Sequence, residues 1–238
     1  MIKKLIPKGI KETVRNAVKK NYGFKEPHEI KTECNNEIIK ARLAEDKELP
    51  KIDLEQKHIN NIRVLLNRFD LLNEMPKNAI CAEIGVNKGE FSEFILKQTT
   101  PQKLHLIDAW GDPARYHDGL KDFVRDKFKN EIEQHKVELN YGFSTVILKE
   151  FPDHYFDWVY LDTVHTYQVT ADELAILKDK VKPGGIIAGH DYIVGNWVGA
   201  CRYGVIEAVH ELCVKDNWEL IYVTITHNES PSFAIKKL

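Results

Sequence analysis

The chain has 238 residues, of which 43% are hydrophobic and 29% are charged. This composition suits one domain of ordinary size plus an extension, and it excludes a disordered chain. The 34 basic and 36 acidic side chains leave a net charge of -2, so there is no overall basic footprint for nucleic acid. The four cysteines are too far apart for a zinc or redox motif.

No apolar run reaches the roughly 20 residues that a membrane-spanning helix needs, and the first residues lack the apolar centre of a secretory signal. The sequence therefore predicts a cytoplasmic protein. Lysines dominate the first 20 residues, and apolar residues fall there at helical spacing, at Ile6, Ile10, Val14, Ala17 and Val18. This short amphipathic helix could pack on its own domain, the commoner case, or contact an anionic membrane surface.

Residues 28–48 are charged and helix-prone, which predicts a helical linker. From Asp53 to Met75 apolar residues recur at intervals of three and four, as in a packed helix, and Pro76 would end it. Residues 1–76 are therefore expected to form an N-terminal helical extension. It could pair two subunits into a homo-oligomer or cover a cleft.

After Pro76, short β-rich runs alternate with helical patterns, which is typical of a parallel sheet covered on both faces. The expected strands are 79–84, 103–108, 136–139, 157–162 and 185–189, and the expected helices are 90–98, 118–134, 144–150, 167–180 and 204–215. Two further runs, 218–226 and 232–237, predict an antiparallel hairpin. Residues 77–238 should thus form an α/β domain with a doubly wound, mostly parallel sheet of seven strands.

The first of these strands leads into a glycine turn that precedes a helix. Glu83, Gly85, Asn87 and Gly89 occupy this turn. Gly85 allows a tight bend and lets a ligand approach the backbone, whereas Gly89 allows close packing of the following helix. The geometry suits a nucleotide-like cofactor, although two glycines before a helix also occur as a plain turn.

The next two strands end in polar residues that strengthen the cofactor interpretation. Asp108 ends the second strand, 23 residues after Gly85, where a carboxylate can accept hydrogen bonds from both ribose hydroxyls. Trp110, close behind it, could stack on adenine or belong to the core. Ser144 follows the third strand and could lie near an adenine ring or cap a helix.

The motifs AEIGVNKG, LIDAWG, YGFS, FDWVYLDTVHTY, VKPGG and AGHDY, with the closing hairpin, resemble class I S-adenosylmethionine-dependent methyltransferases over about residues 78–238. NAD enzymes share the glycine turn and the acid, but the VKPGG turn and the hairpin favour a methyltransferase. The resemblance implies a Rossmann-like methyltransferase fold with S-adenosylmethionine as cofactor. It implies the following cofactor-binding residues: Glu83, Gly85, Asn87, Gly89, Asp108, Ala109, Trp110, Ser144 and Asp162.

Within that class, LDTVHTY followed by AGHDY is similar to the macrocin O-methyltransferase and cephalosporin-pathway methyltransferase group, in which matching positions bind a divalent metal and supply a base. Asp162 ends the fourth strand and Asp191 follows the fifth. Because neighbouring strands lie about 4.8 Å apart, the two carboxylates can converge on one cation such as Mg²⁺. His165, in the loop after Asp162, could take the hydroxyl proton.

The predicted catalytic residues are thus Asp162, His165 and Asp191, and the predicted metal ligands are Asp162, His190 and Asp191. His190 stands where the similar enzymes carry an acid, which leaves the metal open because Mg²⁺ binds imidazole poorly. We expect methyl transfer to a hydroxyl of a small molecule, with a saccharide in surface polysaccharide or natural-product synthesis favoured. The alternatives are a metal-independent enzyme acting on nitrogen or a phosphate-linked group, and an idle scaffold that keeps the fold.

Overall fold

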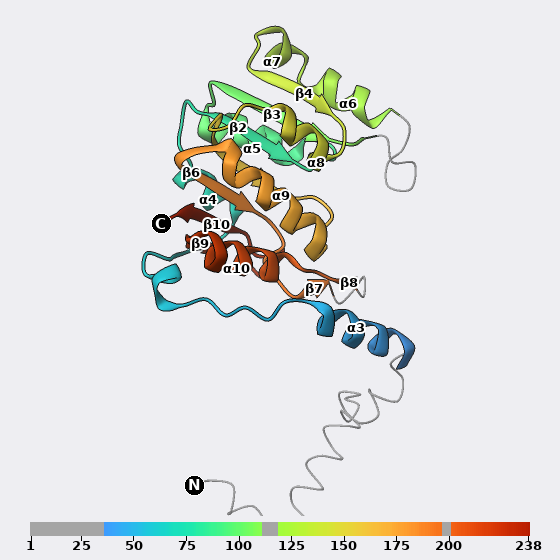
Figure 1. Ribbon diagram of the computed structural model, residues 1–238. Coiled ribbons are helices and arrows are strands. Elements are labelled where there is room, and N and C mark those ends of the chain that lie inside the picture. Colours follow the sequence, from blue (N-terminus) through green and yellow to red (C-terminus); the bar gives the residue numbers. More distant parts are fainter. Residues whose placement is uncertain (1–35, 111–118, 197–200) are drawn as a thin grey trace, which may run out of the picture. The chain divides into compact units, whose positions relative to one another are not determined.

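The computed structural model describes residues 36–110, 119–196 and 201–238 (Figure 1). The chain divides into a unit that ends at Asp46 and a second unit that runs from Lys47 to Leu238. Helix α3 (Asn36–Glu48) confirms the helix expected at the end of the predicted linker. The amphipathic helix predicted at residues 6–18 lies outside the described residues. Within the described ranges, no helix combines the length and the apolar character needed to cross a bilayer.

The described residues of the second unit contain one sheet of eight strands, in the order β1-β9-β10-β6-β5-β2-β3-β4. β10 runs antiparallel to both of its neighbours, and the other pairs are parallel. The doubly wound α/β fold and the terminal antiparallel hairpin are therefore confirmed. The strands are β1 (Arg63–Leu65), β2 (Ile80–Ile84), β3 (Lys103–Asp108), β4 (Val137–Tyr141), β5 (Phe156–Leu161), β6 (Val181–Gly189), β9 (Trp218–Thr224) and β10 (Phe233–Lys237).

Helices cover both faces of this sheet. One face packs against α9 (Tyr167–Lys180) and α10 (Val205–Asp216), which lie side by side in Figure 1. The other packs against α4 (Arg68–Glu74), α5 (Glu90–Thr99) and α6 (Leu120–Lys127). The shorter elements are η1 (Gln56–Ile59), α7 (Lys129–Glu133), α8 (Ser144–Ile147), η2 (Leu148–Glu150), and the pair β7 (Gly195–Asn196) and β8 (Cys201–Arg202).

The predicted helix at residues 53–75 is wrong. This segment instead contains η1, the edge strand β1 and the short helix α4. The side chain of Asn67 accepts hydrogen bonds from the backbone N–H groups of Phe69 and Asp70, so a new helix begins there. β1 pairs in parallel with β9 and supplies the eighth strand that the sequence did not predict. Pairing with a distant strand thus overrides a spacing that fits a helix.

Alternation along β5 shows why the central strands are apolar on both faces. Trp158 and Tyr160 are fully buried against α4 and α5, whereas Val159 and Leu161 pack toward α9 and α10. Because helices cover both faces of the sheet, a polar site is expected in the loops at the carboxyl ends of the strands.

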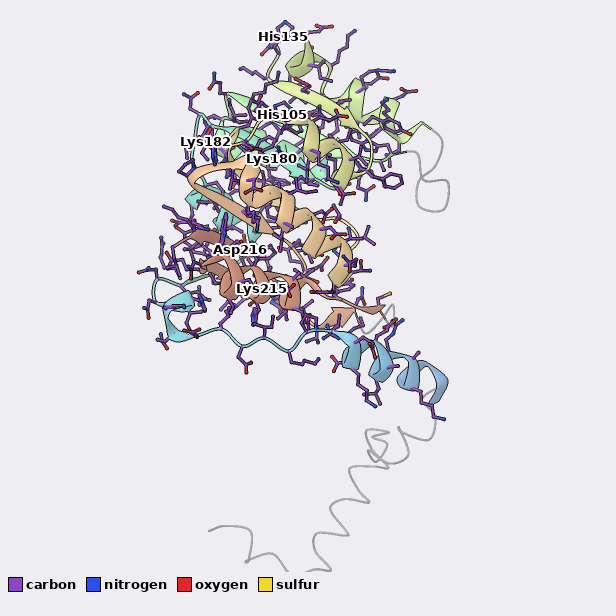
Figure 2. All side chains as sticks on the ribbon, in the orientation of Figure 1. His105, His135, Lys180, Lys182, Lys215 and Asp216 are labelled. Atoms are coloured by element: carbon purple, nitrogen blue, oxygen red, sulfur yellow. The ribbon has the colours of Figure 1, made fainter. Side chains whose placement is uncertain are left out.

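Surface ion pairs lie at the opposite end of the sheet, where strands β5 and β6 begin. Lys182 at the start of β6 lies 2.7 Å from a carboxylate oxygen of Asp157 at the start of β5, and Lys180 lies 2.7 Å from one of Asp153. Figure 2 labels both lysines at this end of the sheet. Exposed pairs of this kind contribute little to stability. The carboxyl edge is therefore the place to look for a site.

The packing of α4 generates a prediction about where the folded domain begins. A chain that starts at Lys77 loses β1 together with Leu71 and Leu72, both fully buried. Losing two buried leucines costs about 5 kcal/mol or more, which is comparable to the whole stability of a domain. Circular dichroism should show a cooperative thermal transition for a chain that starts at Lys47 and none for one that starts at Lys77. Equal transitions would contradict this boundary.

Candidate functional site

A cavity of about 510 Å³ lies at the carboxyl ends of β2, β3, β4 and β5. Its walls come from the loops that follow these strands and from α4 and α5. Of the predicted cofactor-binding residues, all line this cavity except Gly89 and Trp110. The full lining consists of Arg68, Glu83, Gly85, Val86, Asn87, Lys88, Glu90, Phe91, Ile107, Asp108, Ala109, Gly142, Phe143, Ser144, Asp162, Thr163, Val164 and His165.

The glycine turn after β2 lies directly against the exit of β5. Gly85 has a φ of +90°, and a Cβ there would collide with the carbonyl oxygen of Asp162. The backbone N–H of Asp162 donates to the carbonyl oxygen of Ile84 at 2.8 Å, which holds the two segments together. Only glycine fits this position. Gly89 has a φ of +68°, and a Cβ there would collide with the Phe128 ring, so this glycine allows the close packing at the start of α5.

Asp108 holds the glycine turn in shape. One oxygen of its carboxylate accepts the backbone N–H groups of Val86 and Asn87, each at 2.8 Å, and the other accepts that of Trp110 at 2.9 Å. The buried Trp110 indole donates to the carbonyl oxygen of Asn87 at 2.9 Å. Trp110 therefore packs beneath the turn. Since a carboxylate offers about four lone pairs, Asp108 can still accept a hydrogen bond from a ligand.

Glu83 supplies a buried carboxyl to the cavity wall. It accepts a hydrogen bond from the hydroxyl of Ser92, and burial raises its pKa to about 8. The side chain is therefore protonated and neutral at neutral pH. Glu83 therefore adds no negative charge to the wall beside the glycine turn.

The structure brings together the three predicted catalytic residues. Possible ligand atoms of Asp162, His165 and Asp191 all lie within 4.8 Å of one another. The Nδ1 atom of His165 lies 3.0 Å from an oxygen of Asp191. Both residues have positive φ angles, 63° for His165 and 55° for Asp191. Such angles are uncommon away from glycine, and they are more frequent at functional sites.

We call Asp162, His165 and Asp191 the acid–histidine cluster. Arg68 supplies a positive charge beside it. Burial raises the pKa of Asp162 to about 7, Asp191 adds to the rise, and Arg68 opposes it. The guanidinium of Arg68 lies 3.9 Å from an oxygen of Asp162 and 2.9 Å from one of Glu229. The sequence did not single out Arg68 or Glu229, because one falls in the predicted long helix and the other in a hairpin turn.

The structure places His190 outside the acid–histidine cluster. Its Nδ1 atom lies 3.0 Å from the Ser232 hydroxyl and 3.4 Å from that of Tyr160. Burial lowers the pKa of His190 to about 4, so the imidazole is neutral at physiological pH. It links the exit of β6 to the start of β10.

Ser144 takes part in a second polar group behind the cavity wall. Its hydroxyl donates to one carboxylate oxygen of Glu173 at 2.5 Å, and the Thr163 hydroxyl donates to the other at 2.9 Å. Phe143, not Ser144, occupies the N-cap position of α8. The sequence did carry a signal for Glu173, which falls on the same face of α9 as the buried Thr170, Leu174 and Leu177.

Comparisons with known proteins agree with this fold. Residues 82–192, a little under half of the chain, match a family described as "Methyltransferase domain". No curated protein matches the sequence.

Solved structures share the fold at low sequence identity. An O-methyltransferase from Bacillus cereus, crystallised with S-adenosylhomocysteine, is 14% identical with a TM-score of 0.53, covering 94% of this chain and 97% of that one. A SAM-dependent methyltransferase from Aquifex aeolicus is 14% identical with a TM-score of 0.52, covering 82% and 97%. A tRNA methyltransferase from Bacillus subtilis is 15% identical with a TM-score of 0.51, covering 73% and 67%. The likeness establishes a Rossmann-like methyltransferase fold.

The raised pKa of Glu83 predicts a pH dependence of stability. The folded protein keeps this proton from the ordinary pKa of 4.5 up to about 8, whereas the unfolded chain releases it. The carboxyl therefore contributes stability at low pH that is lost as pH rises through this range, by about 1.4 kcal/mol per pH unit. Denaturant unfolding at several pH values should show a shallower decline for Glu83→Gln. Parallel curves for the variant and the parent would contradict the prediction.

Proposed function

We propose that this chain transfers a methyl group from S-adenosylmethionine to a hydroxyl of a small molecule. One observation carries the proposal: the acid–histidine cluster adjoins the same cavity as the glycine turn. The family match over residues 82–192 supports S-adenosylmethionine-dependent methyl transfer. The fold alone would not assign a reaction, because one fold serves many activities.

The cavity fits the cofactor at several points. S-adenosylmethionine supplies a methyl carbon on a positively charged sulfur when it is bound. Gly85 lets a ligand approach the backbone, and Asp108 retains acceptor capacity for a ribose hydroxyl. Phe143, which is 69% exposed, offers an apolar ring beside Ser144 for a flat base.

His165 is the proposed general base. An ionised Asp191 accepts a hydrogen bond from Nδ1–H of His165, which leaves the lone pair of the neutral ring on Nε2. The hydroxyl proton of the acceptor then passes to Nε2 while its oxygen attacks the methyl carbon. The charge of Asp191 stabilises the imidazolium that results.

Asp162 and Asp191 are the proposed ligands of a divalent cation. A pair of carboxylates suits Mg²⁺, which prefers a few acidic ligands together with water and substrate oxygens. When bound, such an ion would lower the pKa of the acceptor hydroxyl. His190 is left out of this set because the ligand atoms that lie within 4.8 Å of one another belong to Asp162, His165 and Asp191. His165 lies within reach of the same ion, but its role as base requires the Nε2 lone pair to stay free for the hydroxyl proton.

A saccharide in surface polysaccharide or natural-product synthesis is the proposed acceptor. Near the cluster, the carboxylates of Asp162 and Glu229 could accept hydrogen bonds from the vicinal hydroxyls of a sugar, and the guanidinium of Arg68 could donate to them. The resemblance to the macrocin and cephalosporin-pathway group supports the same class. Screening sugar nucleotides and glycolipids for a mass gain of one methyl would identify the acceptor. Products methylated on nitrogen or phosphate would replace the hydroxyl proposal.

Cofactor binding is the first test. Calorimetry should show that the chain binds S-adenosylhomocysteine and that Asp108→Asn weakens binding about tenfold or more. The amide can accept at its oxygen only, so part of the support for the glycine turn and a ribose contact is lost. Asp126→Asn, at an exposed residue of α6, is the matched control and should bind as the parent does. Unchanged affinity in Asp108→Asn would count against its role.

The metal proposal is tested with Mn²⁺ as a spectroscopic substitute for Mg²⁺. Paramagnetic resonance should detect Mn²⁺ bound to the chain, with affinity at least about tenfold weaker in Asp162→Asn and Asp191→Asn because each removes a negative ligand. His190→Gln should retain the affinity. Failure of the parent chain to bind Mn²⁺, or equal binding by Asp162→Asn, would rule out this site.

A further inference from the structure

A buried carboxylate lies behind one wall of the cavity. Glu173 on α9 has no exposed surface. Each of its two oxygens accepts a hydrogen bond from a different hydroxyl, at 2.5 Å from Ser144 and at 2.9 Å from Thr163. Ser144 follows β4 and Thr163 follows β5, and both line the cavity. One carboxylate therefore joins two lining residues that are distant in the sequence.

This arrangement fixes the hydrogen-bonding character of both hydroxyls. A hydroxyl has one proton to donate and two lone pairs with which to accept. Because an ionised carboxylate can only accept, the protons of Ser144 and Thr163 are both directed at Glu173. The two hydroxyl oxygens can then offer only lone pairs to a ligand.

We infer that Glu173 is a positioning residue that makes this wall of the cavity an acceptor of hydrogen bonds, and so selects a ligand with an N–H donor there. The inference rests on the proposed function, in which the ligand is S-adenosylmethionine and the donor is the exocyclic amine of adenine. A purine with a carbonyl oxygen in place of the amine would bring a third acceptor against the hydroxyl oxygens of Ser144 and Thr163. A site built to hydrogen-bond one partner binds an analogue that lacks the matching group much more weakly.

Charge around Glu173 sets the conditions under which the inference applies. Burial raises the pKa of Glu173 to about 7, and the hydrogen bonds from Ser144 and Thr163 oppose the rise. At pH 8 the carboxylate is mostly ionised. Its neighbour Asp172 is also a carboxylic acid, but it is exposed and accepts a hydrogen bond from Gln168, so it serves as a control position that is not in the cavity wall.

The experiment compares two neutral ligands at pH 8 by calorimetry on the full chain. S-adenosylhomocysteine carries the exocyclic amine, and S-inosylhomocysteine carries an oxygen in its place. The parent chain should prefer the adenosyl ligand by about tenfold or more. Glu173→Gln keeps the shape but introduces an amide that donates to one hydroxyl, whose proton can then turn to the ligand. We expect its preference to fall to a few-fold, whereas Asp172→Asn should keep the parental ratio.

The outcomes separate the inference from the proposed function. If the parent chain binds neither ligand, the proposed function fails and the inference fails with it. If it binds both equally, or if Glu173→Gln keeps the parental ratio, only the inference is overturned, because a purely structural carboxyl would change stability without changing the ratio.

A second pair of variants covers the case in which Glu173→Gln does not fold. Thermal unfolding would reveal that case. Ser144→Ala and Thr163→Val each remove one acceptor from the wall, and at least one of them should lower the preference for S-adenosylhomocysteine several-fold. Parental ratios in both variants would overturn the inference.

Discussion

The close contact between the turn after β2 and the exit of β5 determines the rest of the site. With no side chain at Gly85, the turn can lie against the carbonyl oxygen of Asp162, and a backbone hydrogen bond from Asp162 to Ile84 fixes that position. The same contact places the Asp162 carboxyl beside the cavity. Asp108 then holds the other end of the turn through backbone N–H groups. The binding wall and the reactive cluster are thus parts of one rigid junction.

Much of this junction could be predicted from the sequence. The turn, Asp108, Asp162, His165 and Asp191 follow β-rich runs at positions that parallel strands bring to one edge of a sheet, and the structure assembles them there. Such positions are predictable because strand period and connection handedness leave few topologies. Some roles could be predicted as well: core packing was one of the two alternatives for Trp110, and close helix packing was expected of Gly89. In the structure Trp110 packs against the turn, and Gly89 allows the close packing at the start of α5.

The rest could not be predicted because it depends on partners far away in the sequence. Arg68 meets Glu229 and Asp162 only when α4 packs on the sheet, and the strand β1 that precedes α4 pairs with the distant strand β9. The spacing of residues 53–75 fitted a helix equally well, since local periodicity does not contain that pairing. Glu173 lies between these cases: its place on a buried helix face was visible, but its partners Ser144 and Thr163 were not.

Three carboxyls with raised pKa values lie at or behind the cavity wall: Glu83 and Glu173 are buried, and Asp162 is half-buried. Burying an acid without a full counter-charge destabilises the fold, so this arrangement is a cost that packing elsewhere must offset. It also makes the cavity responsive to the charge of its occupant. A positively charged ligand beside Asp162 would favour the ionised carboxylate and lower its pKa, whereas a neutral product would let the proton return. In a methyltransferase, whose donor loses its positive charge in the reaction, the Asp162 carboxylate would therefore bind the substrate form of the cofactor more tightly than the product form.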